Sequence, residues 1–349
     1  MRTSSGRVGR TATAIAAVLA LAACGASESV PEAEAASGGE SATDYPLVVD
    51  NCGESMTFEA APQRVLSLDQ GSTEILLALG LGDRVVGTAS WTDPVLPELA
   101  DANASVPRLA DNAPSYEAVL GADPDFVTAS FGRHFRQGGV VERPRLAETG
   151  IASYLSPTDC EGDLVINGGG TRTTPLEVDS LYREIRELAE VFDVSSRGEE
   201  LITQLQERAD AATDRIEASD LTMAFWFADT KTPYVAGGLG SANLLATTVG
   251  AENVFADLDD DWPAVGWETV VERDPDVLVL GDLQRDRFPG DRLADKEAFL
   301  AADPLTSTMR AVQDEAYVAL HGAEMNPSIR FVDALEKLAD GLDEIGQAP

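Results

Sequence analysis

The feature that most constrains the fold is a regular alternation of short apolar strands with short helices. Examples are the predicted strand "RVLSL" (64–68), the helix "STEILLALG" (72–80), which Ser72 is expected to cap, and the strand "RVVGTA" (84–89). Strands that are separated by helices pair in parallel, because the helical crossover returns the chain to the same end of the sheet. The alternation therefore predicts an α/β fold.

Two stretches of the sequence repeat one pattern at a constant offset of 151 residues. "EAVLGADPDFVTAS" (117–130) and "ETVVERDPDVLVLG" (268–281) share a glutamate, the triplet Asp-Pro-Asp and a following apolar strand. A looser match relates "LLALGLGDRVVG" (76–87) to "LLATTVGAENVFA" (244–256). Repetition of this kind indicates a duplicated unit, so the sequence predicts two related lobes.

The stretch between the two halves, "SSRGEELITQLQERADAATDRIEASD", has the pattern of one amphipathic helix. Ser196 and Glu199 have the spacing of a capping box, which predicts that the helix begins there. A helix over 196–218 would be about 35 Å long, enough to run along both lobes. Two lobes that are joined by one stiff helix should hinge little.

We therefore predict two Rossmann-like lobes, each with a central, mostly parallel sheet, joined by one long rigid α-helix. The predicted boundaries are an N-terminal lobe over 45–195, the connecting helix over 196–218 and a C-terminal lobe over 219–349. Ligands of parallel sheets bind beyond the carboxyl ends of the strands. A ligand cleft is accordingly expected between the lobes.

The start of the chain has the layout of an export signal, with three arginines in the first ten residues and then an apolar run. The run is shorter than the roughly 20 residues that span a bilayer. It ends in "LAAC", which resembles a bacterial lipobox. We therefore expect a lipoprotein signal peptide over 1–23, a lipidated Cys24, a disordered tether over 24–44 and an extracytoplasmic location on the outer face of the cell membrane. The alternative, a buried amino-terminal helix, lacks a cap.

Two further cysteines, Cys52 and Cys160, would then lie outside the cytoplasm, where disulfides persist. With Cys24 lipidated, a single pairing is available. In the chain-entropy model, closing so long a loop stabilises the fold by up to about 4 to 5 kcal/mol. The alternative is two separate buried thiols.

The charge of the chain restricts its partners. The formal net charge is −35, which makes nucleic acid and anionic lipid poor partners. The chain also lacks a Gly-x-Ser-x-Gly elbow and a His-Glu-x-x-His pair, and "NGGGTR" (167–172) lacks the Gly-Lys-Ser/Thr ending of a phosphate loop. We expect that the protein is not an enzyme and that it binds no cofactor. The alternative from a different functional class is an extracellular hydrolase.

Several stretches together resemble the helix-hinged (class III) substrate-binding lipoproteins of bacterial ABC importers, which carry ferric siderophores, haem or cobalamin. The stretches are "PQRVLSLDQGSTEILLALGLGDRVVG" (62–87), "SYEAVLGADPDFV" (115–127), "ENVFADLDDDWPAVGWETVVERDPDVLVL" (252–280) and "NPSIRFVDALEKL" (326–338). The resemblance implies a monomer that captures a ligand between its lobes and presents it to a membrane permease.

The resemblance also implies that one glutamate in each lobe docks into arginines of the permease. The matching positions are Glu74, in "STEILLALG", and Glu268, in "WPAVGWETV". A carboxylate near a helix start is favoured by the helix dipole and can bind an arginine in bidentate fashion. The alternative is a glutamate that only stabilises its own helix.

Two predicted cleft loops are rich in basic residues and lie at equivalent positions in the two lobes. They are "FGRHFR" (131–136) and "QRDRF" (284–288), and their candidate ligand-binding residues are Arg133, His134, Arg136, Arg285 and Arg287. Arginines that face each other across a cleft favour an anionic or carbonyl-rich ligand. The alternative is a set of surface arginines that balance an acidic shell.

Aromatic residues lie in predicted loops of both lobes, where their rings provide large flat contact area for chelates and macrocycles. The candidates are Trp91, Phe131, Tyr234 and Trp262, and the resemblance places a cleft tryptophan at Trp262. Glu324 is a further candidate because of its loop, and a solvated carboxylate is the alternative there.

We expect the ligand to be an Fe(III)-siderophore chelate whose iron is held by the chelator, so that no residue binds metal directly. Haem is an alternative, with His134 and Tyr234 as iron ligands, because both residue types ligate haem iron. Cobalamin is the remaining alternative on the same fold.

Overall fold

The computed structural model describes residues 42–160, 172–216, 220–285 and 287–346, and the chain from Glu40 onward forms one compact unit. The predicted signal peptide over 1–23, Cys24 and most of the tether over 24–44 lie outside the described residues, as does most of "NGGGTR". Among the helices that are described, none is both long and apolar enough to cross a bilayer.

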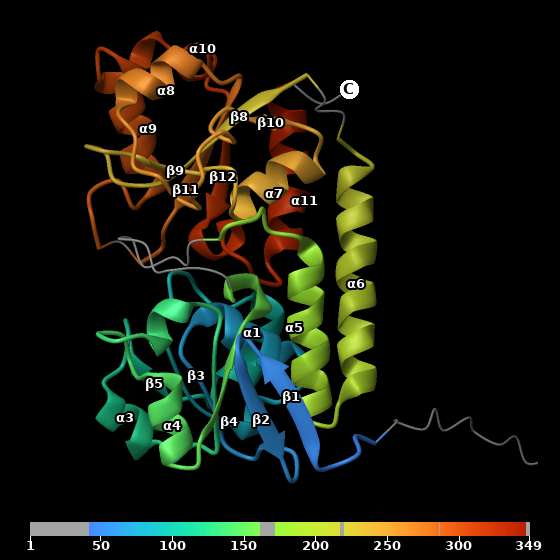
Figure 1. Ribbon diagram of the computed structural model, residues 1–349. Coiled ribbons are helices and arrows are strands. Elements are labelled where there is room, and N and C mark those ends of the chain that lie inside the picture. The colour runs from blue at the N-terminus through green and yellow to red at the C-terminus, as the bar shows by residue number, and fades with distance from the viewer. Residues whose placement is uncertain (1–41, 161–171, 217–219, 286, 347–349) are drawn as a thin grey trace, which may run out of the picture. The chain divides into compact units, whose positions relative to one another are not determined.

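The N-terminal lobe is built on a five-stranded parallel sheet (Figure 1). An antiparallel hairpin precedes it, β1 (Leu47–Asn51) and β2 (Glu54–Phe58). The sheet has the order β5-β4-β3-β6-β7, with β3 (Val65–Ser67), β4 (Val85–Ala89), β5 (Arg108–Ala110), β6 (Phe126–Ala129) and β7 (Ala152–Leu155). Each residue of β3 and β6 is buried, as expected for parallel strands covered on both faces.

Short helices connect these strands. They are α1 (Gln70–Ala78), α2 (Ala100–Asn103), α3 (Tyr116–Gly121), α4 (Arg143–Glu148) and α5 (Val178–Val191), with single 3₁₀ turns η1 (Gly82–Arg84), η2 (Pro97–Leu99), η3 (Gly132–Phe135) and η4 (Pro157–Asp159). The predicted cap of α1 at Ser72 is wrong. The helix begins earlier, because the Asp69 carboxylate accepts a hydrogen bond from the Ser72 N–H at 3.1 Å and is the cap.

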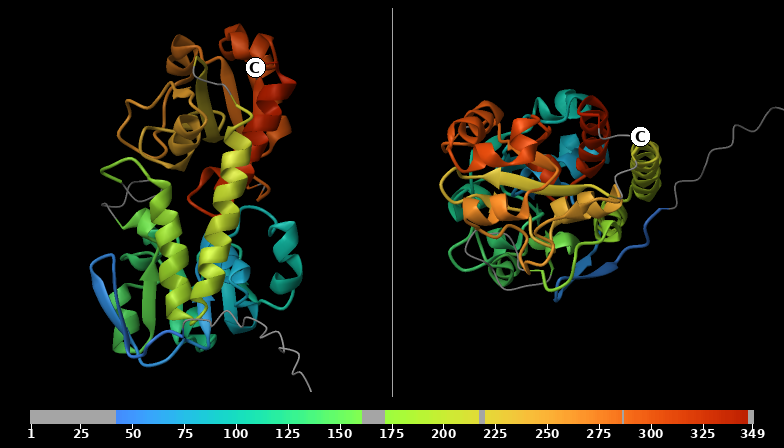
Figure 2. Two further views of the ribbon diagram at one scale, coloured as in Figure 1. Left: turned by 90° about the vertical axis from the view of Figure 1, so that its right-hand side faces the viewer. Right: turned by 90° about the horizontal axis from the view of Figure 1, so that it is seen from above.

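The connecting helix α6 (Ser195–Thr213) follows α5 directly. It packs against α5 of the N-terminal lobe and against α11 of the C-terminal lobe, so that it runs alongside both (Figure 2). The predicted capping box is wrong, because Val194 occupies the cap position and Ser196 lies inside the helix. The helix ends at Thr213, before the predicted end at 218, and residues 217–219 lie outside the described residues.

The C-terminal lobe repeats the plan of the first. Its strands are β8 (Thr222–Ala228), β9 (Tyr234–Val235), β10 (Glu252–Asn253), β11 (Val277–Asp282) and β12 (Tyr317–His321). Its helices are α7 (Ser241–Thr248), α8 (Trp267–Arg273), α9 (Leu293–Ala302), α10 (Arg310–Gln313) and α11 (Phe331–Glu344), with 3₁₀ turns η5 (Thr306–Thr308) and η6 (Gly322–Met325). The parallel order is β10-β8-β11-β12, and β9 pairs antiparallel with β8.

The two sheets have one strand order. The series β4-β3-β6-β7 corresponds to β10-β8-β11-β12, with β5 and β9 added at different places. The repeated sequence pattern falls on α3 and β6 in one lobe and on α8 and β11 in the other. The predicted two-lobed α/β fold is confirmed, and the repeat in the sequence corresponds to a repeat in the topology.

Candidate functional site

A cavity of about 690 Å³ lies between the lobes, lined by residues of both. In each lobe the strand order reverses between two central parallel strands, β3 and β6 in the first and β8 and β11 in the second. Loops that leave the carboxyl ends of strands diverge at such a point and form a crevice. The loops after all four strands line the cavity, which therefore occupies the reversal points of both sheets.

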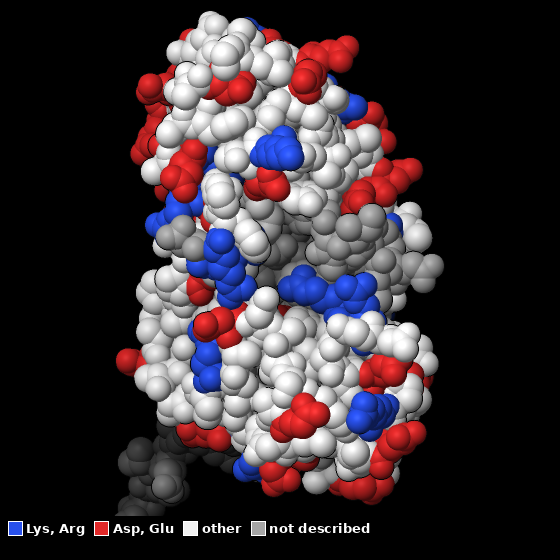
Figure 3. All heavy atoms as spheres, turned by 90° about the vertical axis from the view of Figure 1, so that its left-hand side faces the viewer, with Lys and Arg blue, Asp and Glu red and all other residues white. Residues whose placement is uncertain are grey.

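Five predicted ligand-binding residues line this cavity. They are Phe131, Arg133, Tyr234, Trp262 and Arg285. Lys and Arg side chains gather along the rim of the hollow between the lobes (Figure 3). A volume of this size is typical of pockets that bury a whole small molecule, about 300 to 1,000 Å³.

Arg133 and Arg285 each pack on an aromatic ring, one in each lobe. The guanidinium carbon of Arg133 lies 4.1 Å from the centre of the Phe131 ring, and that of Arg285 lies 5.6 Å from the centre of the Phe288 ring. Burial lowers the pKa of Arg133, and the positive charge of Arg285 acts in the same direction. The two cations are therefore electrostatically coupled across the cavity.

A buried carboxylate fixes the position of Arg285. Asp291 accepts hydrogen bonds from Arg285 Nε at 3.1 Å and Arg285 Nη2 at 3.2 Å, and also from the N–H groups of Arg287 and Phe288. The buried ammonium of Lys296 donates to the backbone carbonyl of Gly281 in β11 and to those of Gly290 and Asp291 in the loop that follows. Buried polar contacts therefore fix this loop and hold the Arg285 side chain at the cavity wall.

His134 does not line the cavity, contrary to prediction. Its side chain is buried, and Nε2 lies 3.7 Å from Asp69 Oδ2. Burial lowers the pKa of His134 to about 4, against the opposing effect of Asp69, so the ring is neutral at pH 7. Because His134 is buried outside the cavity lining that contains Tyr234, the predicted pairing of the two residues on haem iron is wrong.

Trp91, Arg136 and Arg287 also lie outside the cavity lining. Trp91 is buried, with its Nε1–H donated to Thr88 Oγ1 at 2.8 Å. Arg136 is half-buried, and Arg287 is exposed and donates to the Asp111 carbonyl across the lobes at 2.7 Å. The sequence placed these three residues in loops near the cavity but could not show whether their side chains point into it.

Glu324 is not a solvated cleft carboxylate either. It is buried in η6, where Oε2 accepts the His321 N–H at 2.7 Å and Oε1 lies 2.6 Å from Lys337 Nζ. It therefore caps the turn that follows β12 and has no part in the cavity wall.

Glu74, predicted to dock into a permease, is fully buried and paired with Arg330. A carboxylate in this position cannot reach another protein, so the prediction is wrong for Glu74. Glu268 is exposed in the first turn of α8, and the repeat places Glu117 at the equivalent position, exposed in the first turn of α3.

Sequence reasoning missed other residues of the cavity. They are chiefly Asp69, Gln70, Phe227, Asp229, Lys231, Asp260, Asp261, Phe288 and Met325. Six of them follow the carboxyl end of a parallel strand, where the sequence places the ligand: Asp69 and Gln70 after β3, Asp229 and Lys231 after β8, Phe288 after β11, and Met325 after β12. The residue types at these positions are common in loops and give no signal of their own. Only their position after the end of a strand could have identified them from the sequence.

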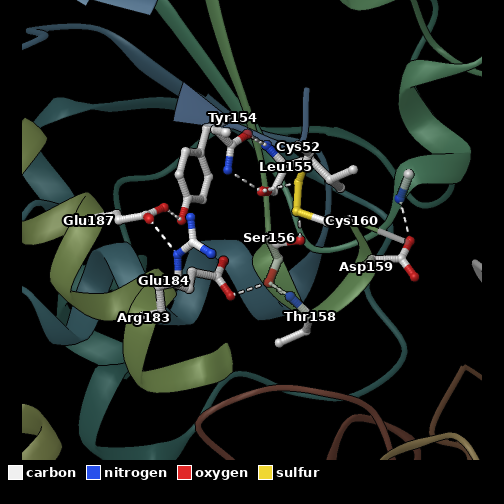
Figure 4. The surroundings of a disulfide bond; sticks show 12 residues. Cys52, Tyr154, Leu155, Ser156, Thr158, Asp159, Cys160, Arg183, Glu184 and Glu187 are labelled. Carbon is white, nitrogen blue, oxygen red and sulfur yellow. Dashed lines mark hydrogen bonds and ion pairs between the residues drawn. A yellow bond between two sulfur atoms is a disulfide. The ribbon is translucent and has the colours of Figure 1, made fainter. Parts of the chain in front are cut away.

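A disulfide joins Cys52, in the turn between β1 and β2, to Cys160 (Figure 4). Asp159, the neighbour of Cys160, accepts the Gly132 N–H at 2.6 Å, and Gly132 lies between the cavity residues Phe131 and Arg133. Burial raises the pKa of Asp159 to about 6. The cross-linked segment therefore supports the loop that carries Arg133.

In the described part of the chain, no group of three or more His, Cys, Asp or Glu side chains is placed to hold a metal ion.

Two duplicated α/β lobes that enclose a cavity with aromatic and charged walls define a bilobed solute-binding protein. The chain matches the family model described as periplasmic binding protein over residues 65–323, and it belongs to that family. The relatives are binding proteins of transport systems, as the sequence resemblance predicted, and the chain is a binding protein rather than an enzyme.

Relatives and solved structures agree with this assignment. The chain is 26% identical to the Vitamin B12-binding protein of Yersinia pestis (strain Pestoides F) over 226 residues, which cover 64% of this chain and 71% of that protein. It is 27% identical, with a TM-score of 0.69, to the ABC-type Fe3+-hydroxamate transport system structure from Saccharomonospora viridis DSM 43017, covering 86% of this chain and 99% of the other.

Two further structures share the fold. A periplasmic binding protein from Veillonella parvula has a TM-score of 0.73 at 23% identity and covers 85% of this chain and 97% of its own. The periplasmic heme-binding protein from Roseiflexus sp. RS-1 has a TM-score of 0.62 at 21% identity and covers 82% of this chain and 99% of its own.

Proposed function

We propose that this chain captures a ferric siderophore in the cavity between its lobes and delivers it to an ABC permease. The observation that carries the proposal is the pair Arg133 and Arg285, one from each lobe, which face one cavity and pack on phenylalanine rings. Guanidinium groups bind the oxygen-rich surface of a ferric chelate, and the rings supply flat apolar contact.

Lys231 adds a third cation to the same cavity. It lies in the loop after β8, whose turn is held by the Asp229 carboxylate through the N–H groups of Lys231 and Thr232. Three cations from two lobes favour a ligand whose donor oxygens point outward in several directions. The likeness to the Fe3+-hydroxamate transport structure supports the same ligand class.

The alternatives of haem and cobalamin are less well supported by the cavity. Of the two histidines in the chain, neither is among the described residues that line it, which leaves Tyr234 as the haem ligand from the predicted pair. Cobalamin is favoured by the Vitamin B12-binding relative alone.

Titration of the purified protein with ferric tris-hydroxamate and ferric tris-catecholate chelates tests the proposal. Trp262 lines the cavity, whereas the other three tryptophans are buried, so saturable quenching of its fluorescence should report binding. Trp262→Phe is the control for that signal. Absence of saturable quenching by every ferric chelate, together with a Soret shift that Tyr234→Phe abolishes, would move the assignment to haem.

The proposal includes the route to the membrane. Lipidation of Cys24 would hold the protein at the outer face of the cell membrane, and Glu268 with Glu117 would bind permease arginines. In support, α3 and α8 lie on the same side of the molecule, away from α6, and their glutamates are equivalent in the repeat (Figure 1). Metabolic labelling with a radioactive fatty acid, lost in Cys24→Ser, tests the anchor.

A further inference from the structure

Among the described residues, four carboxylates line the cavity that is proposed to take an oxygen-rich chelate. They belong to Asp69, Asp229, Asp260 and Asp261. A negatively charged wall repels anionic ligands, so the way in which the chain offsets these charges decides which ligands the cavity accepts.

Three of the four accept hydrogen bonds from backbone N–H groups. The donors are Ser72 and Ser130 for Asp69, Lys231 and Thr232 for Asp229, and Trp262 for Asp260. Backbone donors stabilise a carboxylate without cancelling its unit charge. These three carboxylates therefore keep their negative charge, and among the described residues the cations that oppose them in the cavity lining are Arg133, Lys231 and Arg285.

Asp261 is offset in a different way, by a guanidinium group from the other lobe. Arg172 Nε lies 3.2 Å from Asp261 Oδ1 and 3.1 Å from Oδ2, and Arg172 Nη2 lies 3.0 Å from Oδ2. The two side chains are 6% and 9% exposed. Among the described ion pairs, this is the one in which a permanent cation meets a cavity carboxylate.

The position of Arg172 is behind the wall. The described residues that line the cavity include Asp261 and Trp262 but not Arg172, which belongs to the chain that enters α5 of the N-terminal lobe. Asp159 is a further charged group close to this pair. Its pKa is lowered by the charge of Arg172 and raised by that of Asp261. Arg172 therefore balances a local excess of negative charge.

We propose that Arg172 is a positioning residue that sets the charge specificity of the cavity by neutralising Asp261 from behind its wall. With Arg172 in place, Asp261 contributes little net charge to the ligand. Without Arg172, the carboxylate would face the cavity as a full negative charge and would disfavour anionic chelates. The ligand part of this inference rests on the proposed function, whereas the charge part does not.

The charge part is tested without any ligand, by collisional quenching of Trp262, the neighbour of Asp261. Iodide and caesium ions sample the local potential with opposite sign, and acrylamide is the neutral reference. At pH 8, Arg172→Met should lower the ratio of iodide to caesium quenching by about twofold or more, because one negative charge is exposed. Arg172→Met combined with Asp261→Asn should restore the wild-type ratio.

Two controls separate this effect from a general disturbance. Arg208→Met removes an ion pair between α6 and α11 that is remote from the cavity, and should leave the quenching ratio unchanged. Arg172→Lys keeps the positive charge while losing the forked geometry, and should keep most of the wild-type ratio. An unchanged ratio in Arg172→Met would overturn the inference.

The ligand part uses two chelates of different charge. A ferric tris-catecholate is trianionic and a ferric tris-hydroxamate is neutral, so Arg172→Met should weaken the first by about tenfold and the second much less. Equal losses for both chelates would overturn the charge-specific role and leave the proposed function standing. If the wild type bound neither chelate, the proposed function would fail, and the quenching ratio would still decide the role of Arg172.

Discussion

Glu74 and Arg330 form a fully buried ion pair that joins the two lobes beside the cavity. Arg330 Nε donates to Glu74 Oε2 at 2.7 Å, and the side chains are 4% and 0% exposed for the arginine and the glutamate. Glu74 lies in α1 of the first lobe and Arg330 at the start of α11 in the second. Arg330 also donates to the Pro94 carbonyl, so the contact ties three segments together.

Replacing Glu74 should destabilise the protein strongly. Glu74→Gln leaves the Arg330 charge buried without its partner, which costs about 3 to 5 kcal/mol. The free energy of unfolding from urea denaturation measures the effect. Glu268→Gln is the matched control, because Glu268 is exposed, and it should change the unfolding free energy little. Equal stability of the two variants would contradict the buried ion pair.

Removing the disulfide should also lower stability. Cys52 and Cys160 are 108 residues apart, and cross-linking a loop of this size is worth about 4.7 kcal/mol in the chain-entropy model. We expect Cys52→Ser, Cys160→Ser and the double variant to lose similar amounts by urea denaturation, and added reductant to affect only the wild type. A double variant as stable as the oxidised wild type would be inconsistent with this bond.

The buried carboxyl group of Glu184 should lower the stability of the protein as the pH rises. Burial raises its pKa to about 8, and its Oε1 has no hydrogen-bond partner among the described residues. Between the unfolded and folded pKa values the folded state binds more protons, so the free energy of unfolding falls with increasing pH. Two other buried groups act in the opposite direction between pH 6.5 and 8. Burial lowers the pKa of His134 from 6.5 to about 4 and that of Lys296 from 10.5 to about 8, so both partly offset the larger effect of Glu184.

In that window the unfolding free energy of the wild type should fall by about 1 kcal/mol, because His134 and Lys296 offset part of the change that Glu184 alone would cause. In Glu184→Gln the unfolding free energy should no longer fall and should rise slightly with pH, because the side chain at 184 cannot ionise while the other two groups still titrate. Denaturant unfolding at several pH values gives the comparison, and parallel profiles for the two proteins would show that Glu184 is already ionised when folded.

Arg133 and Arg136 provide a contrast within one loop. Arg133 lines the cavity and Arg136 does not. Loss of a charged hydrogen-bond donor to the ligand is worth about 1.5 to 3 kcal/mol, so Arg133→Met should weaken binding of a ferric chelate by about tenfold or more. Arg136→Met should bind nearly as the wild type does. The dissociation constants from Trp262 quenching decide the matter, and equal losses would place both side chains at the ligand.

Docking to the permease should depend on Glu117 and Glu268 and not on ligand affinity. We expect Glu117→Ala and Glu268→Ala to reduce uptake of radioactive iron by cells while leaving the dissociation constant of the chelate unchanged. Glu207→Ala, an exposed glutamate on α6, is the control. Normal uptake in the double variant Glu117→Ala, Glu268→Ala would contradict the docking proposal.

Local sequence patterns predicted the fold well, because strands and helices are specified by residues that are close together in the chain. Apolar runs of strand length and the Asp-Pro-Asp repeat gave the order of elements, and strand ends gave the loops that enclose the cavity. Helix starts were less well predicted. Asp69 rather than Ser72 caps α1, since either residue type can cap and the tertiary position of the turn selects one.

The direction of each side chain was not predictable in this way. Glu74, His134 and Glu324 have residue types that prefer water, yet all three are buried. Glu74 pairs with Arg330, Glu324 pairs with Lys337, and His134 lies 3.7 Å from Asp69. A pattern of neighbouring residues in the sequence could not identify these partners. The internal repeat pairs Glu117, and not Glu74, with Glu268.

The sequence by itself determined the duplicated α/β architecture, the family and the loops of the cavity, because strand and helix periodicity and the repeat are written in neighbouring residues. Only the tertiary structure decided which charges face the ligand and which hold the lobes together. The reason is that a charge becomes a cavity residue, or a buried partner such as Arg330 or Arg172, through the residues that the fold packs against it.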